Sequence, residues 1–252
     1  MIEHQITRFM LVLGIDTTGA SGSLALCRCG PNVLARDFEL LELVTLAGRT
    51  YSAQLMPQIS SLLARHRIGK TAVDAYAVAY GPGSFTGLRV GLSTVKALAE
   101  ILEKPIAAVS LLEALAWAGV ARVSSEGGSD VALSEAQVIA ALDAMRGEVY
   151  VGEYVIRPEA LPRLLREVLM PVQEFAVEAE LGERIAIYTP DEPVASILRA
   201  RGLPVQLVPR PQSGVIARLG AVKITAGQAI SPEALDANYI RRSDAEIFSK
   251  GS

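Results

Sequence analysis

The sequence predicts an α/β protein with two related lobes, each built from a mixed β-sheet with flanking helices. Apolar runs of strand length come first and then alternate with segments of helical periodicity, and this succession occurs twice along the 252 residues. Half of the residues are apolar and only 5% are aromatic, so two cores of modest size can be filled with aliphatic side chains.

The lobe boundary is expected where the first succession ends, near Ser110. We place the first lobe at residues 1–110 and the second at 111–212. A helix at about 213–227 could pack back on the first lobe, and residues 228–252 are expected to form an irregular tail.

The first lobe is predicted to begin with a meander of strands. Residues 10–15 form a buried strand, the polar residues 16–22 form a turn, and residues 23–29 return as a second strand. Gly30-Pro31-Asn32 closes this hairpin, and residues 33–46 offer one or two further extended segments.

A helix follows the meander and runs to about His66. Thr50 or Ser52 can cap its start, since hydroxyl side chains accept hydrogen bonds from the first free backbone amides. Pro57 lies near the beginning and therefore predicts a bend or a late start. One side of the helix is apolar, with Leu55, Ile59 and Leu62 on one face and Met56 and Leu63 beside them.

Residues 73–103 organise the first lobe. A short strand at 75–80 runs into the loop Gly81-Pro82-Gly83-Ser84, whose glycines allow backbone angles that other residues avoid. A long helix continues from Gly87, and Ser84 or Thr86 can cap it.

This long helix has two apolar stripes, although one stripe is enough to hold a helix on its own sheet. Gly87 and Gly91 lie four residues apart on one face and leave room for another backbone to approach. Either the helix is buried inside its own lobe, or the second stripe is a docking surface for another subunit. The first stripe is Leu88, Leu92, Val95, Ala99 and Leu102, and the second is Val90, Ala97, Leu98 and Ile101.

A strand, a glycine loop and a helix N-terminus together also suggest a phosphate site, because free amides and the helix dipole favour an anion. The loop, however, lacks the Gly-Lys-Ser/Thr ending of a P-loop and is not G-x-G-x-x-G. Asp16 ends a buried strand beside Thr17 and Thr18, where it could hold a hydrated metal ion and a phosphate or could cap its own turn. The residues alone leave both interpretations open.

The second lobe is predicted from a similar succession, after a last strand of the first lobe at 106–109. An apolar helix at 111–120 leads into a polar loop at 124–130, and the segment 158–166 is expected to be irregular or helical. Strands at 137–144 and 148–154 are joined by a tight turn, around which Asp143, Arg146 and Glu148 are expected to form an ion pair. The remaining elements are a helix at 172–181, a strand at 184–188, a helix at 194–201 ended by Gly202, a strand at 205–208, and a helix at 213–225 capped at Ser213.

Composition argues against several classes of protein. The formal net charge of −3 does not suit nucleic-acid binding through the overall field, although basic residues exceed acidic ones between 196 and 242. His4 and His66 are isolated, and Cys27 and Cys29 are the only cysteines, so we expect neither a metal site nor a disulfide. The N-terminal apolar run of about six residues is too short for a membrane span or a signal-peptide core, so we expect a cytoplasmic protein.

Four segments carry a family resemblance. The loop and helix from Gly81 to Arg89, with Gly91 and Lys96 beyond, are the most specific. The other segments are Gly14-Ile15-Asp16-Thr17-Thr18, Asp143-Ala144-Met145-Arg146-Gly147-Glu148-Val149-Tyr150 and Tyr239-Ile240-Arg241-Arg242-Ser243-Asp244-Ala245-Glu246. Together they span nearly the whole chain and resemble the TsaB (YeaZ) family, bacterial partner proteins in the formation of threonylcarbamoyladenosine in tRNA.

This resemblance implies a fold of the actin/Hsp70/sugar-kinase type, with two ribonuclease-H-like lobes. It also implies two partners, a larger catalytic relative, TsaD, and the small ATPase TsaE, with tRNA bound only within the complex. TsaD carries a His-x-x-x-His metal pair on the helix that corresponds to residues 52–66, whereas this chain has Tyr51 and Ser52 at the start of that helix and only His66 at its far end. We therefore expect no catalytic residues here and no transfer of the threonylcarbamoyl group by this subunit.

The resemblance further implies that the two helices of the first lobe form an interface, either with the partner or with a second copy of the chain. The residues expected there are Ser52, Leu55, Met56, Ile59, Leu63, Leu88, Gly91, Leu92, Val95 and Leu98. ATP or ADP is expected at the partner interface rather than tightly bound to this chain alone. The corresponding loop residues are Asp16, Thr17, Thr18, Gly81, Gly83, Ser84 and Thr86. Arg241 and Arg242 could touch tRNA in the complex.

Two alternatives stay open. A glycoprotease-like peptidase or a small ATP-dependent enzyme of the same fold would need a nucleophile with its base, a metal, or a complete phosphate clamp. Two scattered histidines do not supply the first, and only Asp16 stands out for the last. A stand-alone homodimeric binding protein could use the same two helices.

Overall fold

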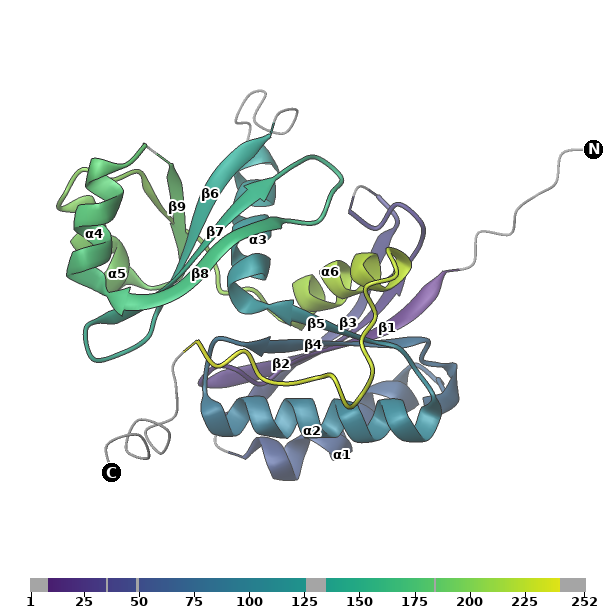
Figure 1. Ribbon diagram of the computed structural model, residues 1–252. Helices are drawn as coiled ribbons and strands as arrows, with labels where there is room; N and C mark the ends of the chain where they lie inside the picture. The colour runs from purple at the N-terminus through teal and green to yellow at the C-terminus, as the bar shows by residue number, and fades with distance from the viewer. Residues whose placement is uncertain (1–8, 35, 49, 126–134, 184, 241–252) are drawn as a thin grey trace, which may run out of the picture. The chain divides into compact units, whose positions relative to one another are not determined.

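The protein forms two compact units, each with its own sheet. The computed structural model describes residues 9–34, 36–48, 50–125, 135–183 and 185–240 (Figure 1). Unit 1 comprises residues 1–109 and 212–237, and unit 2 comprises residues 110–211 and 238–252. The two mixed five-stranded sheets with flanking helices confirm the predicted fold class. Residues 126–130 of the expected polar loop, and everything from Arg241 onward, lie outside the described residues.

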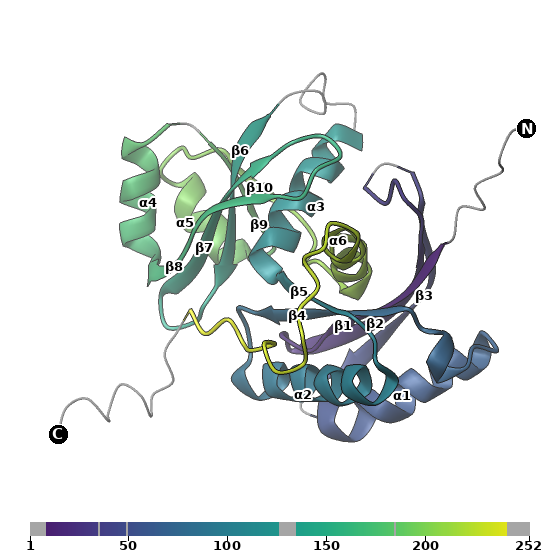
Figure 2. The same ribbon diagram turned by 45° about the vertical axis from the view of Figure 1, so that its right-hand side comes forward.

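Unit 1 is built around a sheet with the strand order β3-β2-β1-β4-β5. Its strands are β1 (Met10–Asp16), β2 (Ser21–Cys29), β3 (Phe38–Ala47), β4 (Ala75–Gly81) and β5 (Ile106–Ser110), and its helices are α1 (Tyr51–Arg65), the short 3₁₀ helix η1 (Lys70–Ala72), α2 (Phe85–Leu102) and α6 (Ser213–Thr225). β1 pairs antiparallel with β2 and parallel with β4, so the central strands carry the antiparallel-to-parallel change. α1 and α2 cover one face of this sheet and α6 covers the other (Figures 1 and 2).

The main core of unit 1 lies between the sheet and the pair α1 and α2. Ile15 and Leu24 from the strands meet Leu55 and Ile59 from α1 and Val95 from α2, and all of them are buried. The first predicted face of α1 (Leu55, Ile59 and Leu62) is therefore the buried one, and most of the first stripe of α2 (Leu88, Leu92, Val95 and Ala99) is buried too, whereas Met56, Ala97 and Ile101 point outward.

α6 forms over the predicted residues, but its start differs from the prediction. Gln212 is at the N-cap position, not Ser213. The backbone amide of Ser213 donates to the Ser23 hydroxyl at 2.9 Å, so Ser213 lies inside the first turn, facing the sheet. The predicted cap at Ser213 is wrong because packing against β2 decides where the helix begins.

α1 begins at Tyr51 despite Pro57, so the predicted late start is wrong. The Tyr51 hydroxyl donates to the carbonyl oxygen of Gly19 at 2.8 Å, and its buried ring anchors the first turn. Thr50 is the N-cap residue, but its hydroxyl accepts a hydrogen bond from the Gln54 side chain and caps no backbone amide.

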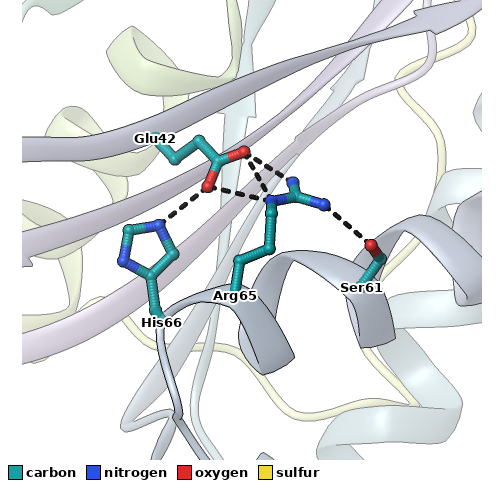
Figure 3. A network of polar contacts seen from close by, with 4 residues as sticks. All are labelled: Glu42, Ser61, Arg65 and His66. Carbon is teal, nitrogen blue, oxygen red and sulfur yellow. Dashed lines mark hydrogen bonds and ion pairs between the residues drawn. The ribbon is translucent and has the colours of Figure 1, made fainter.

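The C-terminal end of α1 is tied to β3 by a polar network (Figure 3). The Glu42 carboxylate accepts a hydrogen bond from Arg65 Nε at 3.0 Å, and His66 Nε2 lies 2.8 Å from its other oxygen. Arg65 also donates to the Ser61 hydroxyl at 2.7 Å, so the guanidinium is held between helix and strand. Arg65 and His66 lower the pKa of Glu42 below its ordinary value, since both favour the carboxylate, with the Arg65 hydrogen bond as the largest cause.

Unit 2 contains a sheet with the strand order β10-β9-β6-β7-β8. Its strands are β6 (Ala136–Asp143), β7 (Glu148–Ile156), β8 (Arg163–Pro171), β9 (Ala186–Thr189) and β10 (Val205–Leu207), and its helices are α3 (Leu111–Ser125), α4 (Val172–Leu181) and α5 (Glu192–Arg199). β6, β7 and β8 form an antiparallel meander, while β9 pairs parallel with β6 and β10.

Both faces of this second sheet are covered. On one face α3 packs through Leu112 and Leu115 against Tyr154. On the other face Phe175 of α4 and Leu198 of α5 are buried against the strands. No helix in the described part of the chain is long and apolar enough to cross a membrane.

Residues 158–162 are irregular, as expected for the segment 158–166, but the prediction of an irregular or helical segment is wrong from residue 163, where β8 (163–171) begins. The spacing of Leu164, Leu165 and Val168 resembles a helical stripe, which explains the error. Pairing with β7 overrides this local pattern, with a bulge at Leu165 of β8, which has no partner where the register shifts between Glu153 and Tyr154.

Candidate functional site

The polar turn at residues 16–22, called here the Asp16 turn, lies at the end of β1. Asp16 Oδ1 accepts hydrogen bonds from the Thr18 amide at 2.8 Å and from the Thr18 hydroxyl at 2.6 Å. Asp16, Thr17 and Thr18 are all nearly inaccessible to solvent, between 0 and 3% exposed. The carboxylate thus stabilises its own turn, one of the two arrangements that the sequence left open.

The Asp16 turn packs directly on the first turns of α2. The Thr17 hydroxyl donates to the Gly87 carbonyl oxygen at 2.7 Å, and the Ser84 amide donates to the Thr18 carbonyl oxygen at 2.8 Å. A Cβ atom at Gly91 would lie 2.4 Å from Thr17 Oγ1, and one at Gly87 would lie 2.0 Å from the Thr17 carbonyl oxygen. The close approach at Gly87 and Gly91 is therefore made by Thr17 of the same chain, through its backbone at Gly87 and its side chain at Gly91.

The loop before α2 holds the other predicted nucleotide residues. Ser84 caps α2, as predicted, since its hydroxyl accepts a hydrogen bond from the Gly87 amide at 3.3 Å. Gly83 lies against Thr18, Gly81 ends β4 at φ 138° before a cis bond to Pro82, and Thr86 is exposed. The structure thus gathers Thr17, Thr18, Gly83 and Ser84 in one place.

Most of the residues predicted for an interface are buried inside unit 1. This holds for Leu55, Ile59, Leu63, Leu88, Gly91, Leu92, Val95 and Leu98. Only Ser52 and Met56 of that set are exposed. Any interface on these helices must therefore be made by the outward side chains, while the buried set supports the fold beneath them.

The outward side chains of the two helices form a weakly charged surface, called here the α1–α2 surface. Met56 is 38% exposed, Phe85 39% and Ile101 78%. The Arg89 guanidinium stacks on the Phe85 ring at 3.8 Å, a pair that the sequence analysis missed although its i, i+4 spacing on a helix was visible. We define this surface by Ser52, Ala53, Met56, Ser60 and Ala64 of α1 and Phe85, Arg89, Ser93, Ala97 and Ile101 of α2; the charged residues Arg65 and Glu100, near the C-terminal ends of the two helices, are exposed as well.

The turn between β6 and β7 has an unusual backbone. Met145, Arg146 and Gly147 all have positive φ, at 62°, 58° and 78°. The Met145 amide donates to Asp143 Oδ1 at 2.8 Å, which holds the turn. A shallow cavity of about 210 Å³, lined by Arg146, Val172 and Val194 among others, lies beside it. The ion pair expected around this turn stays a prediction.

The two cysteines are buried, free thiols on β2. Burial raises the pKa of both thiols, that of Cys29 to about 12 even though Arg218 acts in the opposite direction. Among the described residues no group of three His, Cys, Asp or Glu side chains is placed to hold a metal ion.

Comparisons with known proteins identify the relatives of this chain. The model of the family described as TsaD, tRNA N6-adenosine threonylcarbamoyltransferase, matches residues 45–197. The tRNA threonylcarbamoyladenosine biosynthesis protein TsaB of Bacillus subtilis is 27% identical over 94% of this chain and 96% of its own length. The protein of the same name from Haemophilus influenzae is 34% identical over 58% of this chain and 54% of its own length.

A solved structure extends the similarity to the fold. YeaZ from Pseudomonas aeruginosa is 25% identical, covers 90% of this chain and 99% of its own, and superposes with a TM-score of 0.67. The family model, the TsaB relatives and this structure agree, and the chain belongs to the TsaB (YeaZ) family, within the wider group that the TsaD family model describes.

Proposed function

We propose that this chain acts in the biosynthesis of threonylcarbamoyladenosine in tRNA as a binding subunit without catalytic activity of its own. It pairs with a TsaD-like catalytic paralogue, and a TsaE-like ATPase joins the same complex. The names of its TsaB relatives support the pathway. The α1–α2 surface is the observation that supports a binding role.

The composition of the α1–α2 surface suits burial against another protein. α1 has no charged residue from Tyr51 to Ala64, whereas a solvated helix normally carries charges on its outer face. Its outward residues are mostly small, which allows a second helix to approach closely. Met56, Phe85 and Ile101 add apolar area, and the Phe85–Arg89 pair adds an ordered aromatic and guanidinium contact of the kind that is enriched at interfaces.

The same surface serves self-association. A second copy of the chain offers identical helices, so a homodimer and the mixed complex with the paralogue compete for one surface. The first measurement is light scattering after gel filtration of the chain alone and mixed with the TsaD-like protein of the same organism. A dimer that gives way to a one-to-one complex supports the proposal, and a chain that ignores the paralogue contradicts it.

Two exposed residues test the surface without touching the core. Met56→Glu and Ile101→Glu place a carboxylate where an apolar partner would have to desolvate it, so we expect complex formation to be lost while the thermal stability of the chain stays unchanged. Val177→Glu and Leu181→Glu on α4 are matched controls, being exposed apolar helix residues of unit 2. Equal binding by both pairs of variants would show that another surface makes the complex.

Activity provides an independent measure. Formation of threonylcarbamoyladenosine in tRNA by the reconstituted proteins is expected to require this chain and to fall with the Met56→Glu and Ile101→Glu variants in proportion to complex formation. Modification of tRNA by this chain without any partner would overturn the non-catalytic role.

Nucleotide binds only once the complex has formed. Two contacts support this. The Asp16 carboxylate accepts hydrogen bonds from Thr18, and the Thr17 hydroxyl donates to the Gly87 carbonyl oxygen, so both groups already have hydrogen-bond partners within the chain. Titration calorimetry with ATP and ADP is expected to give no tight binding to the isolated chain and measurable binding to the mixed complex. Tight ATP binding by the isolated chain would contradict this and favour an ATP-dependent enzyme.

A further inference from the structure

The cavity beside the β6–β7 turn, called here the Met145 cavity, is built from three segments of unit 2. The turn supplies Met145 and Arg146, the start of α4 supplies Val172, and α5 supplies Val194 and Ile197. α4 and α5 pack on the same face of the unit 2 sheet (Figure 1). The described residues that line the cavity all belong to unit 2, so the cavity is defined within this unit alone.

Two hydrogen bonds join these segments to one another. The Val172 amide donates to the Gly147 carbonyl oxygen at 2.9 Å, which ties the turn to α4. The Asp143 amide donates to Asp191 Oδ2 at 2.8 Å, which ties the end of β6 to the N-cap residue of α5. The Met145 cavity is therefore preformed, and its walls lose little conformational entropy when they take up an occupant.

Met145 is an exposed apolar residue with an unfavourable backbone conformation. The residue is 67% exposed, and both it and Arg146 have the positive φ that glycine adopts far more readily than other residues. A methionine side chain is flexible and adapts to apolar groups of different shape, which makes it common at binding surfaces. The turn thus keeps an adaptable apolar side chain at the edge of the cavity.

The size and the lining of the cavity decide what kind of group it can take. Val172, Val194 and Ile197 give it apolar walls. Its volume of about 210 Å³ is below the roughly 300–1,000 Å³ of sites that take whole small-molecule ligands. An apolar cavity of about 150 Å³ is nevertheless large enough for benzene. The Met145 cavity therefore fits one apolar side chain of a partner, and is too small for a nucleotide.

The charges at the cavity determine which partner segment suits it. Asp143 and Glu148 line the cavity, and Asp191 is hydrogen-bonded to the Asp143 amide. Arg146 is the one basic residue among the described residues of the lining. Three carboxylates thus lie at the cavity with one guanidinium, so the local field favours a segment with positive charge.

We propose that the Met145 cavity is a docking site for a peptide segment of another protein, which inserts one apolar side chain and carries lysine or arginine on both sides of it. The cavity buries the apolar side chain, and the carboxylates of Asp143, Glu148 and Asp191 attract the basic flanks. This site lies in unit 2 and shares no residue with the α1–α2 surface of unit 1, so it serves a second interaction.

Methyl NMR of the intact chain detects weak binding and locates it. The probe is the peptide Gly-Lys-Arg-Ser-Leu-Ser-Arg-Lys-Gly, titrated into protein labelled at its methionine, isoleucine and valine methyl groups. We expect saturable shifts at Met145, Val194 and Ile197. A peptide with serine in place of the leucine should bind at least about tenfold more weakly, because it has no apolar side chain to bury. A peptide with glutamate in place of each lysine and arginine should also bind more weakly, and this difference should shrink at high salt.

Two variants test the cavity in different ways. Met145→Ser removes the adaptable apolar side chain, and Ile197→Trp fills the cavity, so each should weaken binding of the leucine peptide about fivefold or more. Leu164→Ser is the matched control, since Leu164 is 52% exposed on β8 and does not line the cavity. Met145→Ser decides the matter alone if Ile197→Trp fails to fold, because Met145 is largely exposed.

Shifts at the cavity that require both the leucine and the basic flanks, and that weaken in Met145→Ser but not in Leu164→Ser, support the docking site. It would be overturned by the absence of saturable shifts there, by equal binding of the serine or glutamate peptide, or by equal weakening in Leu164→Ser. Self-association of the isolated chain that Met145→Ser abolishes, measured by light scattering, would assign the cavity to a second copy and overturn the proposal too.

Discussion

At Gly91 the chain has no space for one more carbon atom. A Cβ there would lie 2.4 Å from Thr17 Oγ1, and the next nearest atom, Thr17 Cβ, would be at an ordinary contact distance of 3.6 Å. The Thr17 hydroxyl cannot retreat without losing its hydrogen bond to the Gly87 carbonyl oxygen. The steric conflict at this position is therefore with one atom of one side chain.

Gly91→Ala is expected to destabilise the protein by about 1–3 kcal/mol, the usual cost of overpacking a well-packed site. The double variant Gly91→Ala/Thr17→Ala removes the clashing oxygen, so it should lose less stability than the sum of the two single variants. Urea unfolding of the four proteins gives this coupling energy directly.

Gly214→Ala provides the control for the glycine itself. Gly214 also lies in a helix, but a Cβ there meets only Leu40 side-chain atoms, at 3.6 and 3.8 Å. Its replacement should be neutral or stabilising, because alanine restricts the unfolded chain more than glycine does. Additive losses in the Thr17 cycle would show that the strain at Gly91 comes from elsewhere.

At the scale of elements, the end of α1 depends on Glu42 of β3. This carboxylate accepts a hydrogen bond from Arg65 and lies within hydrogen-bond distance of the His66 ring (Figure 3). The lowered pKa of Glu42 means that the folded protein holds the charged form more tightly than the unfolded chain does. Its contribution to stability is therefore present above the ordinary carboxyl pKa and is lost as pH falls through the lowered one.

Glu42→Gln is expected to lower the melting temperature modestly at neutral pH, because the network is partly exposed and screened by solvent. The difference from wild type should shrink as pH falls below the ordinary value of 4.5, where Glu42 becomes protonated in both states. Calorimetry at several pH values measures this. Glu39→Gln is the control. Glu39 lies on β3, as Glu42 does, and its replacement removes an exposed ion pair with Arg28 of β2, so it measures the effect of losing a surface carboxylate. A difference that grows as the pH becomes more acidic would contradict the assignment.

The elements with clear periodicity could be predicted from the sequence. β1, β4, α2, α4 and α6 lie within a few residues of the predicted ranges, because their apolar spacing is also their burial pattern. β8 could not be predicted in this way, because pairing with β7 overrides a helix-like spacing of its apolar residues. Nothing local in the sequence reveals that the Glu167 carboxylate accepts hydrogen bonds from Ser110, Tyr154 and Asn238.

The candidate site was predictable in part. The spacing of Gly87 and Gly91 correctly indicated a close approach, but only the fold could reveal that Thr17 makes it, through its backbone carbonyl at Gly87 and its side chain at Gly91. The apolar stripes of α2 predicted burial, but the sequence could not divide them between core and outward face. Leu92 is 5% exposed and Ile101 is 78% exposed, although both belong to apolar stripes of one helix.

On the scale of the whole molecule, each unit carries residues whose fluorescence or chemical labelling reports its unfolding. Trp117, the only tryptophan, lies on α3 in unit 2, and both thiols lie on β2 in unit 1. The units have separate sheets and separate cores. Unfolding of one unit can therefore be observed independently of the other.

We expect urea unfolding curves from Trp117 fluorescence and from thiol labelling of Cys27 and Cys29 not to coincide, because separate cores need not melt together. Labelling should be slow until unit 1 opens, since both thiols are buried and their pKa is raised. Superimposable curves would instead mean that the two units unfold as one cooperative structure.

The return of α6 to unit 1 has a consequence for synthesis on the ribosome. Ser23 on β2 receives its hydrogen bond from Ser213, 190 residues later in the chain, and α6 covers a whole face of β1, β2 and β4. That face stays bare until residue 225 has left the exit tunnel, by which time the strands and helices described for unit 2 have already been made. The unit that the ribosome begins first is thus the one that it completes last, and a nascent chain must keep an unfinished apolar sheet from aggregation while unit 2 folds.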